Sequence, residues 1–398
     1  YDMDNKALDR LNEIADEFGA IAKKVNESSQ ERKNHSEEAI KFIKKSLELG
    51  EILNNDVMQI SEINKELRDQ DNSVFNTCLL LKTIIDKQKD LLQSLLGEKI
   101  ISEELVDEIN EITDIFQESL NKALDIVQEV IVADNDIILM DDLIVTRKKF
   151  QRDCIQQLKE LAFRSLEDAE NAIKGSSSNL DRGLAMVERL KNVESLISEK
   201  NNYEIESLIK EAHEGWKIAE KVNKSSSSQL EFTEKVNLFT EQLHEDSIGI
   251  KNLVVEKHEL FKNNLERITI LTVILSLEFK TFLETKDIID KIDMAQHYSI
   301  ENRNNLINLI SYMNIASNKI EHLASLNYDM TDRIHINADL ESKSVELTSV
   351  ELNYYESIKT EVNAMTEATR YPIEGSSQNI KNGQELENIL KDLAKTIS

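Results

Sequence analysis

Apolar residues recur every three or four positions along most of this chain, and that spacing predicts α-helix. Near the start of the chain the steps between successive apolar residues alternate between three and four, a period typical of a coiled coil or a long helical bundle. The residues are Leu8, Leu11, Ala15, Phe18, Ala22 and Val25. A similar period returns in residues 105–130 and 386–397, and the alternation typical of strands never persists beyond a few positions. We therefore predict an all-α chain of long helices that pair along their length.

The sequence also repeats itself at a spacing of about 200 residues. Three pairs of segments carry the match, at offsets of 197, 200 and 198 residues: 21–29 with 218–226, 173–180 with 373–380, and 81–86 with 279–284. In the first pair seven of nine positions are identical. Because the three pairs lie on nearly one diagonal, they predict a tandem duplication. We expect an antiparallel, up-down, coiled-coil-like bundle in residues 1–200 and another in 201–398, with their boundary near residues 195–205, inside a continuous helix.

Turn-forming residues are scarce, since the chain has one proline and nine glycines. The clearest turn falls at residues 97–102, where Ser102 is placed to cap the next helix and two glutamates follow in its first turn. Ser299 is the counterpart of Ser102 in the second repeat. Both positions are therefore predicted helix starts.

Other polar segments predict further breaks. The clusters at residues 69–73, 134–136 and 327–329 are rich in Asp and Asn and predict turns. Pro372 disfavours helical geometry just before it, so a helix is expected to stop or kink there. The first repeat has Ala172 at that place and can continue as helix.

Charge narrows the classes of partner. The chain has 48 basic and 75 acidic residues, a formal net charge of -27, which repels the phosphates of nucleic acids and of anionic lipids. The longest uncharged apolar run, Ile268–Leu277, is far shorter than the roughly 20 residues of a membrane-spanning helix. Since the chain begins at Tyr1, we expect a fragment that contacts membranes only through a segment not present here. Protein partners are expected, with a homodimer as an open alternative.

Two cysteines, Cys78 and Cys154, occupy apolar helical stretches with no metal-binding or redox spacing. They are interpreted as buried small hydrophobic residues, and a single disulfide between them stays open as an alternative. A chain of this length does not need one, which favours a reducing, cytoplasmic compartment.

Candidate metal ligands are few. The histidines are scattered: His35, His213, His244, His258, His297, His322 and His335. Glu241 and His244 have the Glu-x-x-His spacing that carboxylate-bridged di-iron bundles use. Such a site needs a second copy of the motif and two further glutamates, and the first repeat has no equivalent histidine. Scattered surface histidines are the favoured interpretation, and no metal is predicted.

Motifs for nucleotide binding or nucleophilic catalysis are absent from the sequence, so we predict no enzyme and no cofactor. The serine clusters at residues 176–178 and 225–228 favour close passage of helices, with phosphorylation as an alternative. Trp216 is interpreted as a packing residue. Adjacent glutamates at residues 37–38 and 103–104 are of the kind that chemoreceptor adaptation enzymes methylate, but such pairs are common on any acidic helix.

Residues 275–289, with Phe279 in an apolar frame, resemble a helical motif of the bacterial chemotaxis phosphatase and of related chemoreceptor-like bundles. Where that family has its catalytic acid and amide, this chain has Thr281 and Thr285, and the first repeat has Thr83 and Lys87. Neither pair can ligate a metal ion and orient a water molecule as Asp and Gln would. The tip motif of chemoreceptors is absent as well. The resemblance thus implies a signalling-type helical bundle without the phosphatase chemistry.

The leading hypothesis is a non-enzymatic helical signalling or protein-interaction module, related to chemotaxis or two-component signalling. Three alternatives remain: a cytoplasmic fragment of a chemoreceptor-like sensory transducer, a structural coiled-coil spacer, and a relative of the response-regulator phosphatases.

Overall fold

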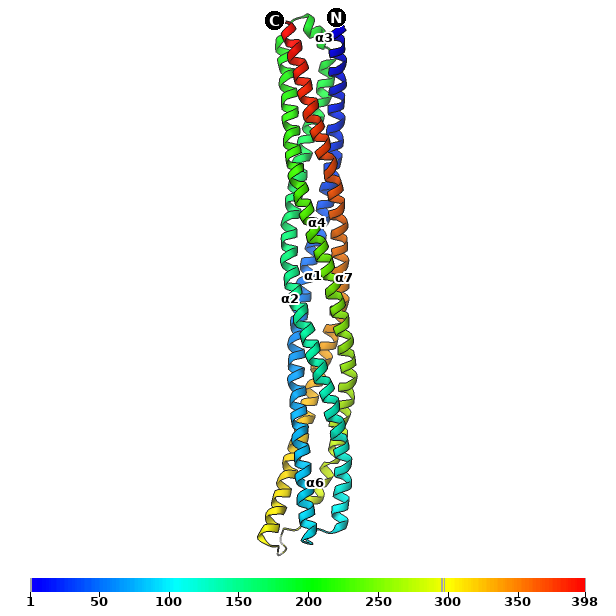
Figure 1. The fold of residues 1–398 in the computed structure, drawn as a ribbon, viewed down its shortest axis with the longest axis vertical. Helices are drawn as coiled ribbons and strands as arrows, with labels where there is room; N and C mark the ends of the chain where they lie inside the picture. Colours follow the sequence, from blue (N-terminus) through cyan, green and yellow to red (C-terminus); the bar gives the residue numbers. More distant parts are fainter. Residues whose placement is uncertain (1, 295, 297, 398) are drawn as a thin grey trace. The chain divides into compact units, whose positions relative to one another are not determined.

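The computed structural model describes residues 2–294, 296 and 298–397. The helical segments follow in the order α1 (Asp2–Gly97), α2 (Glu103–Leu190), α3 (Val193–Ser198), α4 (Asn202–Val273), η1 (Ile274–Glu278), α5 (Phe279–Thr281), α6 (Leu283–Asp290) and α7 (Ile300–Ile397) (Figure 1). The described residues contain no strand, so the predicted all-α class is confirmed. None of the described helices is long and apolar enough to cross a membrane.

The chain forms two compact units, and each is built from four helical segments, one each from α1, α2, the α4–α6 stretch and α7. Unit 1 comprises Tyr1–Glu51, Lys149–Gly249 and Val350–Ser398, and unit 2 comprises Ile52–Lys148 and Ile250–Ser349. These units differ from the expected bundles at 1–200 and 201–398, because each takes segments from both halves of the chain. Each half is a hairpin of long helices, and a lone hairpin leaves one apolar face uncovered. Two hairpins that pack together cover both faces.

The sequence repeat has a geometric counterpart in unit 1. Asn26 of α1 donates to the carbonyl of Ile173 on α2 at 3.1 Å, and Asn223 of α4 donates to the carbonyl of Ile373 on α7 at 2.9 Å. Asn26 also donates to the hydroxyl of Ser176, and Asn223 donates to that of Ser376, at 3.1 Å in both cases. Within unit 1, therefore, α1 is equivalent to α4 and α2 is equivalent to α7.

The contacts between the two hairpins repeat as well. Asn179 of α2 donates to the carbonyl of Gly215 on α4, and Asn379 of α7 donates to the carbonyl of Phe18 on α1, both at 3.1 Å. The donors are 200 residues apart and the acceptors 197 residues apart, as in the sequence match. Figure 1 shows the blue start of α1 running beside the red end of α7 in this unit.

The predicted apolar positions form the cores. In unit 1 the positions from Leu11 to Val25 of the first seam are buried, and only Leu8 is half-buried. In unit 2 the ring of Phe116 on α2 lies 4.9 Å from that of Phe279 and 4.3 Å from that of Phe282. Burial of these side chains supplies the main stabilisation, roughly 25 cal/mol for each Å² of apolar surface removed from water.

Both predicted helix starts are confirmed. The backbone N–H of Leu105 donates to the hydroxyl of Ser102 at 3.2 Å, and that of Asn302 donates to the hydroxyl of Ser299 at 3.2 Å. Each hydroxyl satisfies one of the N–H groups that a helix leaves without a partner in its first turn.

The three turns predicted at residues 69–73, 134–136 and 327–329 are wrong, since these segments lie inside α1, α2 and α7. The reason is that one polar residue of each segment, Asp71, Asp134 or Asn327, is buried against other helices. Asn264 of α4 donates to the buried Asp134 at 2.9 Å, and Thr272 donates to the buried Asn327 at 3.0 Å. Asp and Asn are common both in turns and at buried positions where they bond to another helix, so their presence alone does not distinguish the two.

The predicted continuous helix through residues 195–205 is also wrong, and, of the stop or kink predicted at Pro372, the stop does not occur. The chain is not one helix through residues 195–205, because α2 ends at Leu190 and Lys200 takes a left-handed backbone conformation, with φ of 53°, before α4 begins. Conversely, α7 does not stop at Pro372 but continues to Ile397. Proline removes a single backbone donor. Its ring is buried and its own carbonyl accepts a hydrogen bond from Ser376, so packing holds the segment helical.

The second repeat contains one extra residue before its aromatic pair. The offset between equivalent positions is 197 at Val25 and Val222 but 198 at Leu81 and Phe279. The π-helical turn η1 lies between these two places. Because a π-helical turn has its hydrogen bonds one residue further apart than an α-helical turn, we place the extra residue in η1.

Candidate functional site

Of Glu241 and His244, the two residues with the spacing of a metal motif, only His244 makes an inter-helix contact. Glu241 is exposed on α4, and Nε2 of His244 lies 3.6 Å from Oε1 of Glu356 on α7. In the part of the chain that the structure describes, no three His, Cys, Asp or Glu side chains gather so that they could hold a metal ion. The Glu-x-x-His spacing therefore accompanies a polar contact between α4 and α7.

The positions that correspond to the phosphatase motif have local roles. Thr281 and Thr285 donate to backbone carbonyls three residues earlier, at 2.6 Å and 2.5 Å, and Thr83 donates to the carbonyl four residues earlier at 3.2 Å. Nζ of Lys87 lies 5.1 Å from the centre of the Tyr312 ring, a cation–π contact. Each of these four side chains thus interacts with a nearby backbone carbonyl or, in the case of Lys87, with an aromatic ring.

The cysteines are not linked. Cys78 is buried in unit 2, Cys154 is half-buried in unit 1, and both are free, so the disulfide alternative is wrong. Burial raises the pKa of Cys78 to about 12, and burial followed by Asp246 and Asp153 raises the pKa of Cys154. Both are therefore thiols rather than reactive thiolates at neutral pH.

Unit 2 contains a buried ionic layer that the sequence analysis did not identify. Nζ of Lys257 on α4 lies 2.6 Å from Oδ1 of Asp141 on α2 and 3.0 Å from Oε1 of Glu341 on α7, and all three side chains are 0% exposed. Asn64 of α1 donates to the other oxygen of Asp141 at 2.7 Å, and Asn337 of α7 donates to Asn64 at 2.7 Å. All four helices of the unit contribute to this layer.

The charges in the buried ionic layer depend on one another. Burial raises the pKa values of Asp141 and Glu341, and the ammonium of Lys257 opposes that shift without cancelling it. Burial also acts against the charge of Lys257, but Glu341 and Asp141 outweigh it and raise the pKa of the lysine. One cation thus serves two carboxyl groups on two different helices, and a proton is bound to this pair more readily than to carboxyl groups in water.

A second polar layer lies one heptad further along the same helices. Asp71 of α1 and Asp134 of α2 face each other there, and Asn264 of α4 donates to Asp134. Burial, followed by the hydrogen bond and the charge of Asp134, raises the pKa of Asp71 well above its usual range. Burial likewise raises the pKa of Asp134, while Asp71, Asn264 and Arg68 lower it. The two carboxyl groups therefore favour a shared proton.

Unit 1 has an open groove of about 470 Å³ between α2 and α4. Its lining comprises Asn171, Ala172, Lys174, Gly175 and Ser178 from α2, and Ile218, Lys221, Val222 and Ser225 from α4. The helices pass closely at its floor, because a Cβ on Gly175 would lie 2.7 Å from Cγ2 of Val222. The floor is apolar, with Ala172 and Val222 buried, and both lysines are exposed at the rim. The small residues of the 176–178 cluster thus accompany the close helix passage that the sequence predicted.

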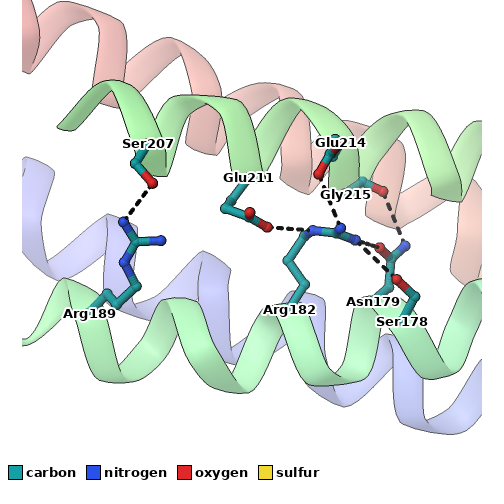
Figure 2. A network of polar contacts seen from close by, with 8 residues as sticks. All are labelled: Ser178, Asn179, Arg182, Arg189, Ser207, Glu211, Glu214 and Gly215. Atoms are coloured by element: carbon teal, nitrogen blue, oxygen red, sulfur yellow. Dashed lines mark hydrogen bonds and ion pairs between the residues drawn. The ribbon is translucent and has the colours of Figure 1, made fainter. Parts of the chain in front are cut away.

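A polar network fixes α2 against α4 beside this groove (Figure 2). Arg182, whose side chain is only 13% exposed, donates to Glu211 at 2.9 Å and to Glu214 at 3.4 Å. It also donates to Asn179 at 3.0 Å and to Ser178, a residue of the groove, at 3.5 Å. Since Arg182 is held by groups on both helices, the network holds one end of the groove in place.

Trp216 is part of a second polar cluster of unit 1. Its indole N–H donates to Oε2 of Glu387 on α7 at 2.5 Å, and Nδ1 of His213 lies 3.1 Å from Oε1 of the same carboxylate. Burial raises the pKa of Glu387, but hydrogen bonds from Trp216, Lys391 and His213 outweigh burial and lower it. The tryptophan predicted as a packing residue is also a hydrogen-bond donor between α4 and α7.

The groove was within reach of the sequence, since the matches 173–180 with 373–380 and 21–29 with 218–226 together align seven of its nine lining residues, and Asn171 and Ala172 lie directly before the first of them. The buried ionic layer gave no such signal, because Lys257 aligns with Ile60 and looks like any charged residue on an acidic helix. No protein-family model matches this chain, and no curated protein is significantly similar to it.

Proposed function

We propose that this chain is a non-enzymatic helical signalling and protein-interaction module, in which the buried ionic layer of unit 2 allows the helices two arrangements. The observation that carries the proposal is the position of Lys257 between Asp141 and Glu341. Buried ion pairs are often no more stabilising than apolar side chains of the same volume, but they can specify how helices are aligned. A lysine with carboxyl partners on α2 and α7 can keep one partner while α4 shifts and loosens the other.

Helix continuity supports the same proposal. α1, α2 and α7 each continue without a break from residues of one unit into residues of the other, and α4 does so too. Small shifts of packed helices are an established way to transmit a binding event over distance. A displacement of α4 at the buried ionic layer would be carried along the backbone of that helix.

The proposed setting is the cytoplasm, with protein partners. Two free cysteines suit a reducing compartment. The net charge of -27 favours partners with basic surfaces over nucleic acids. The local hydrogen bonds of Thr281 and Thr285 argue for a signalling role without phosphatase chemistry.

The proposal is tested by measuring distances across unit 2. Spin labels on the exposed residues Glu62 of α1 and Glu256 of α4, in a chain with both cysteines replaced by alanine, report the position of α4. We expect two distance populations whose ratio changes between about pH 5 and about pH 8, because protonation of the layer alters its pairing. Circular dichroism of the labelled chain verifies that it is folded.

The matched control replaces the layer with apolar residues of similar size, Asp141→Leu, Lys257→Met and Glu341→Leu together. This variant should show one population at both pH values, since it has no ion pairs to exchange. A single distance in the unsubstituted chain, unchanged with pH, would refute the proposal and favour a structural spacer.

A further inference from the structure

We propose that the groove between α2 and α4 of unit 1 binds a small aromatic carboxylate, with its ring on the apolar floor and its carboxylate between Lys174 and Lys221. This inference does not depend on the proposed signalling role. It rests on a comparison of the groove with the equivalent place in the other repeat, which the chain itself fills.

The two places have the same floor. The repeat offsets relate Gly175 to Gly375 and Val222 to Val25. A Cβ on Gly375 would lie 2.7 Å from Cγ2 of Val25, the same distance as that between Gly175 and Val222. The close passage of α7 over α1 therefore reproduces that of α2 over α4, down to the glycine that permits it.

The difference between the two places is one aromatic side chain. Asn171 lines the open groove, and Tyr371 stands at the equivalent position of α7. Cε1 of Tyr371 lies 3.1 Å from the Cβ position of Gly375, so its ring covers the glycine. Accordingly Gly375 is buried whereas Gly175 is half-buried. The chain thus shows that a phenol ring fits this floor, and the open copy lacks that ring.

A cation already sits against the ring in the filled copy. Nζ of Lys24 lies 5.9 Å from the centre of the Tyr371 ring. Its equivalent in the open groove is Lys221. A cation near the face of an aromatic ring is favourable, so Lys221 offers a ligand ring the same contact.

The charge of the open groove adds a preference for an anion. Lys174 stands where the filled copy has Glu374, so two lysines flank the open groove instead of one lysine and one glutamate. Among the residues that the structure describes, no carboxylate oxygen lies within 4.0 Å of either ammonium. Nearby acidic residues are engaged by other groups: Asp168 bonds to Ser225 and is attracted to Arg32, Glu170 pairs with Lys33 at 3.9 Å, and Glu220 pairs with Lys224 at 3.4 Å. Two lysines without ion-pair partners, in a chain of net charge -27, form a local site for a carboxylate.

The size of the groove suits such a ligand, because about 470 Å³ falls in the range of small-molecule sites. The rigid α2–α4 contact at Arg182 keeps one end preformed. An aromatic ring with a short acidic arm fills the floor and reaches the rim.

Calorimetric titration of the whole chain with 4-hydroxyphenylacetate tests the proposal. We expect saturable binding of one molecule per chain, with weaker binding of p-cresol, which lacks the carboxylate, and of acetate, which lacks the ring. Asn171→Tyr copies the filled repeat and should lower the affinity at least about ten-fold. Lys174→Glu with Lys221→Glu should do the same by removing the charges. Absence of saturable binding below about 10 mM would overturn the proposal.

The repeat provides a gain-of-function control. Tyr371→Asn together with Glu374→Lys should open the second groove and raise the stoichiometry from one molecule per chain to two. Circular dichroism verifies that each variant is folded. Unchanged binding by both Asn171→Tyr and the double lysine variant would place the ligand elsewhere and refute the assignment.

Discussion

Arg32 of α1 donates a hydrogen bond of 3.1 Å to the side-chain oxygen of Gln229 on α4, although the two residues occupy equivalent positions of the two repeats, 197 residues apart. Both are buried, so the equivalent positions meet in the core of unit 1. Burial lowers the pKa of Arg32 to about 10, against the attraction of Asp168. Two arginines at this contact would repel each other, and the repeats have instead diverged into a donor and an acceptor.

This contact predicts a loss of stability for Arg32→Gln, which makes the side chains at the two positions identical. The variant loses the hydrogen bonds of Arg32 to Ser165, at 3.1 Å and 3.4 Å, and should lower the free energy of unfolding by about 1–3 kcal/mol. Urea denaturation measures the change. The matched control is Arg10→Gln, which removes a solvent-exposed ion pair with Glu385 and should leave the free energy of unfolding nearly unchanged. Equal effects of the two variants would contradict the assigned role.

The buried ionic layer predicts opposite effects for partial and complete replacement. Lys257→Met alone leaves Asp141 and Glu341 buried without their cation and should destabilise the chain by about 3–5 kcal/mol at neutral pH. The triple apolar variant should be as stable as the unsubstituted chain, or more stable by about 1–4 kcal/mol. Chemical denaturation of the three proteins provides the comparison. A triple variant as unstable as the single one would show that the layer stabilises unit 2.

The raised pKa of Asp71 predicts that the stability of the chain depends on pH. Its pKa in the folded chain is raised above the unfolded value of 3.8, so its favourable contribution is complete below about pH 3.8 and is lost as the pH rises through the folded pKa. Asp71→Asn, which stays neutral, should be more stable than the unsubstituted chain at pH 7 by about 1–3 kcal/mol.

That advantage should shrink towards acidic pH, as measured by denaturation at several pH values. Asp69→Asn, an exposed neighbour on α1, should show no such trend. An advantage that stayed constant with pH would argue against a shared proton between Asp71 and Asp134.

The close helix contacts predict opposite effects for two glycine substitutions. A Cβ on Gly183 would lie 2.8 Å from the Cα of Gly19, so Gly183→Ala should separate α2 from α1 and lower stability by about 1–3 kcal/mol. A Cβ on Gly50 would meet only a side-chain oxygen, at 3.9 Å. Gly50→Ala should therefore raise stability by about 0.5–1 kcal/mol, since alanine favours helix. Thermal melting distinguishes the two, and destabilisation by both would contradict the contact geometry.

The sequence predicted the features that depend on local period. Apolar spacing gave the helices, the three matched segments gave the repeat, and Ser102 and Ser299 gave the helix starts. A helix period does not specify which helices meet, however. The sequence therefore predicted a domain boundary near residue 200, whereas each compact unit contains segments of both hairpins.

Polar core residues were the main source of error. Asp134 and Asn327 predicted turns because Asp and Asn disfavour helix interiors, but across a bundle each has a hydrogen-bond partner that offsets that preference. Lys257 gave no signal for the same reason, since its partners Asp141 and Glu341 are more than 80 residues away in sequence. The difference between Asn171 and Tyr371, in contrast, can be found from the sequence, because the alignment of the two repeats pairs these positions.

The π-helical turn η1 has a consequence for how the duplicated gene can change. One residue added to an α-helix rotates everything after it by about 100°, which would turn Phe279 and Phe282 away from Phe116. Because η1 takes up the added residue, both phenylalanines stay in the core at the positions equivalent to Leu81 and Ile84. A difference of one codon between the two copies is thus compatible with the same core positions in both.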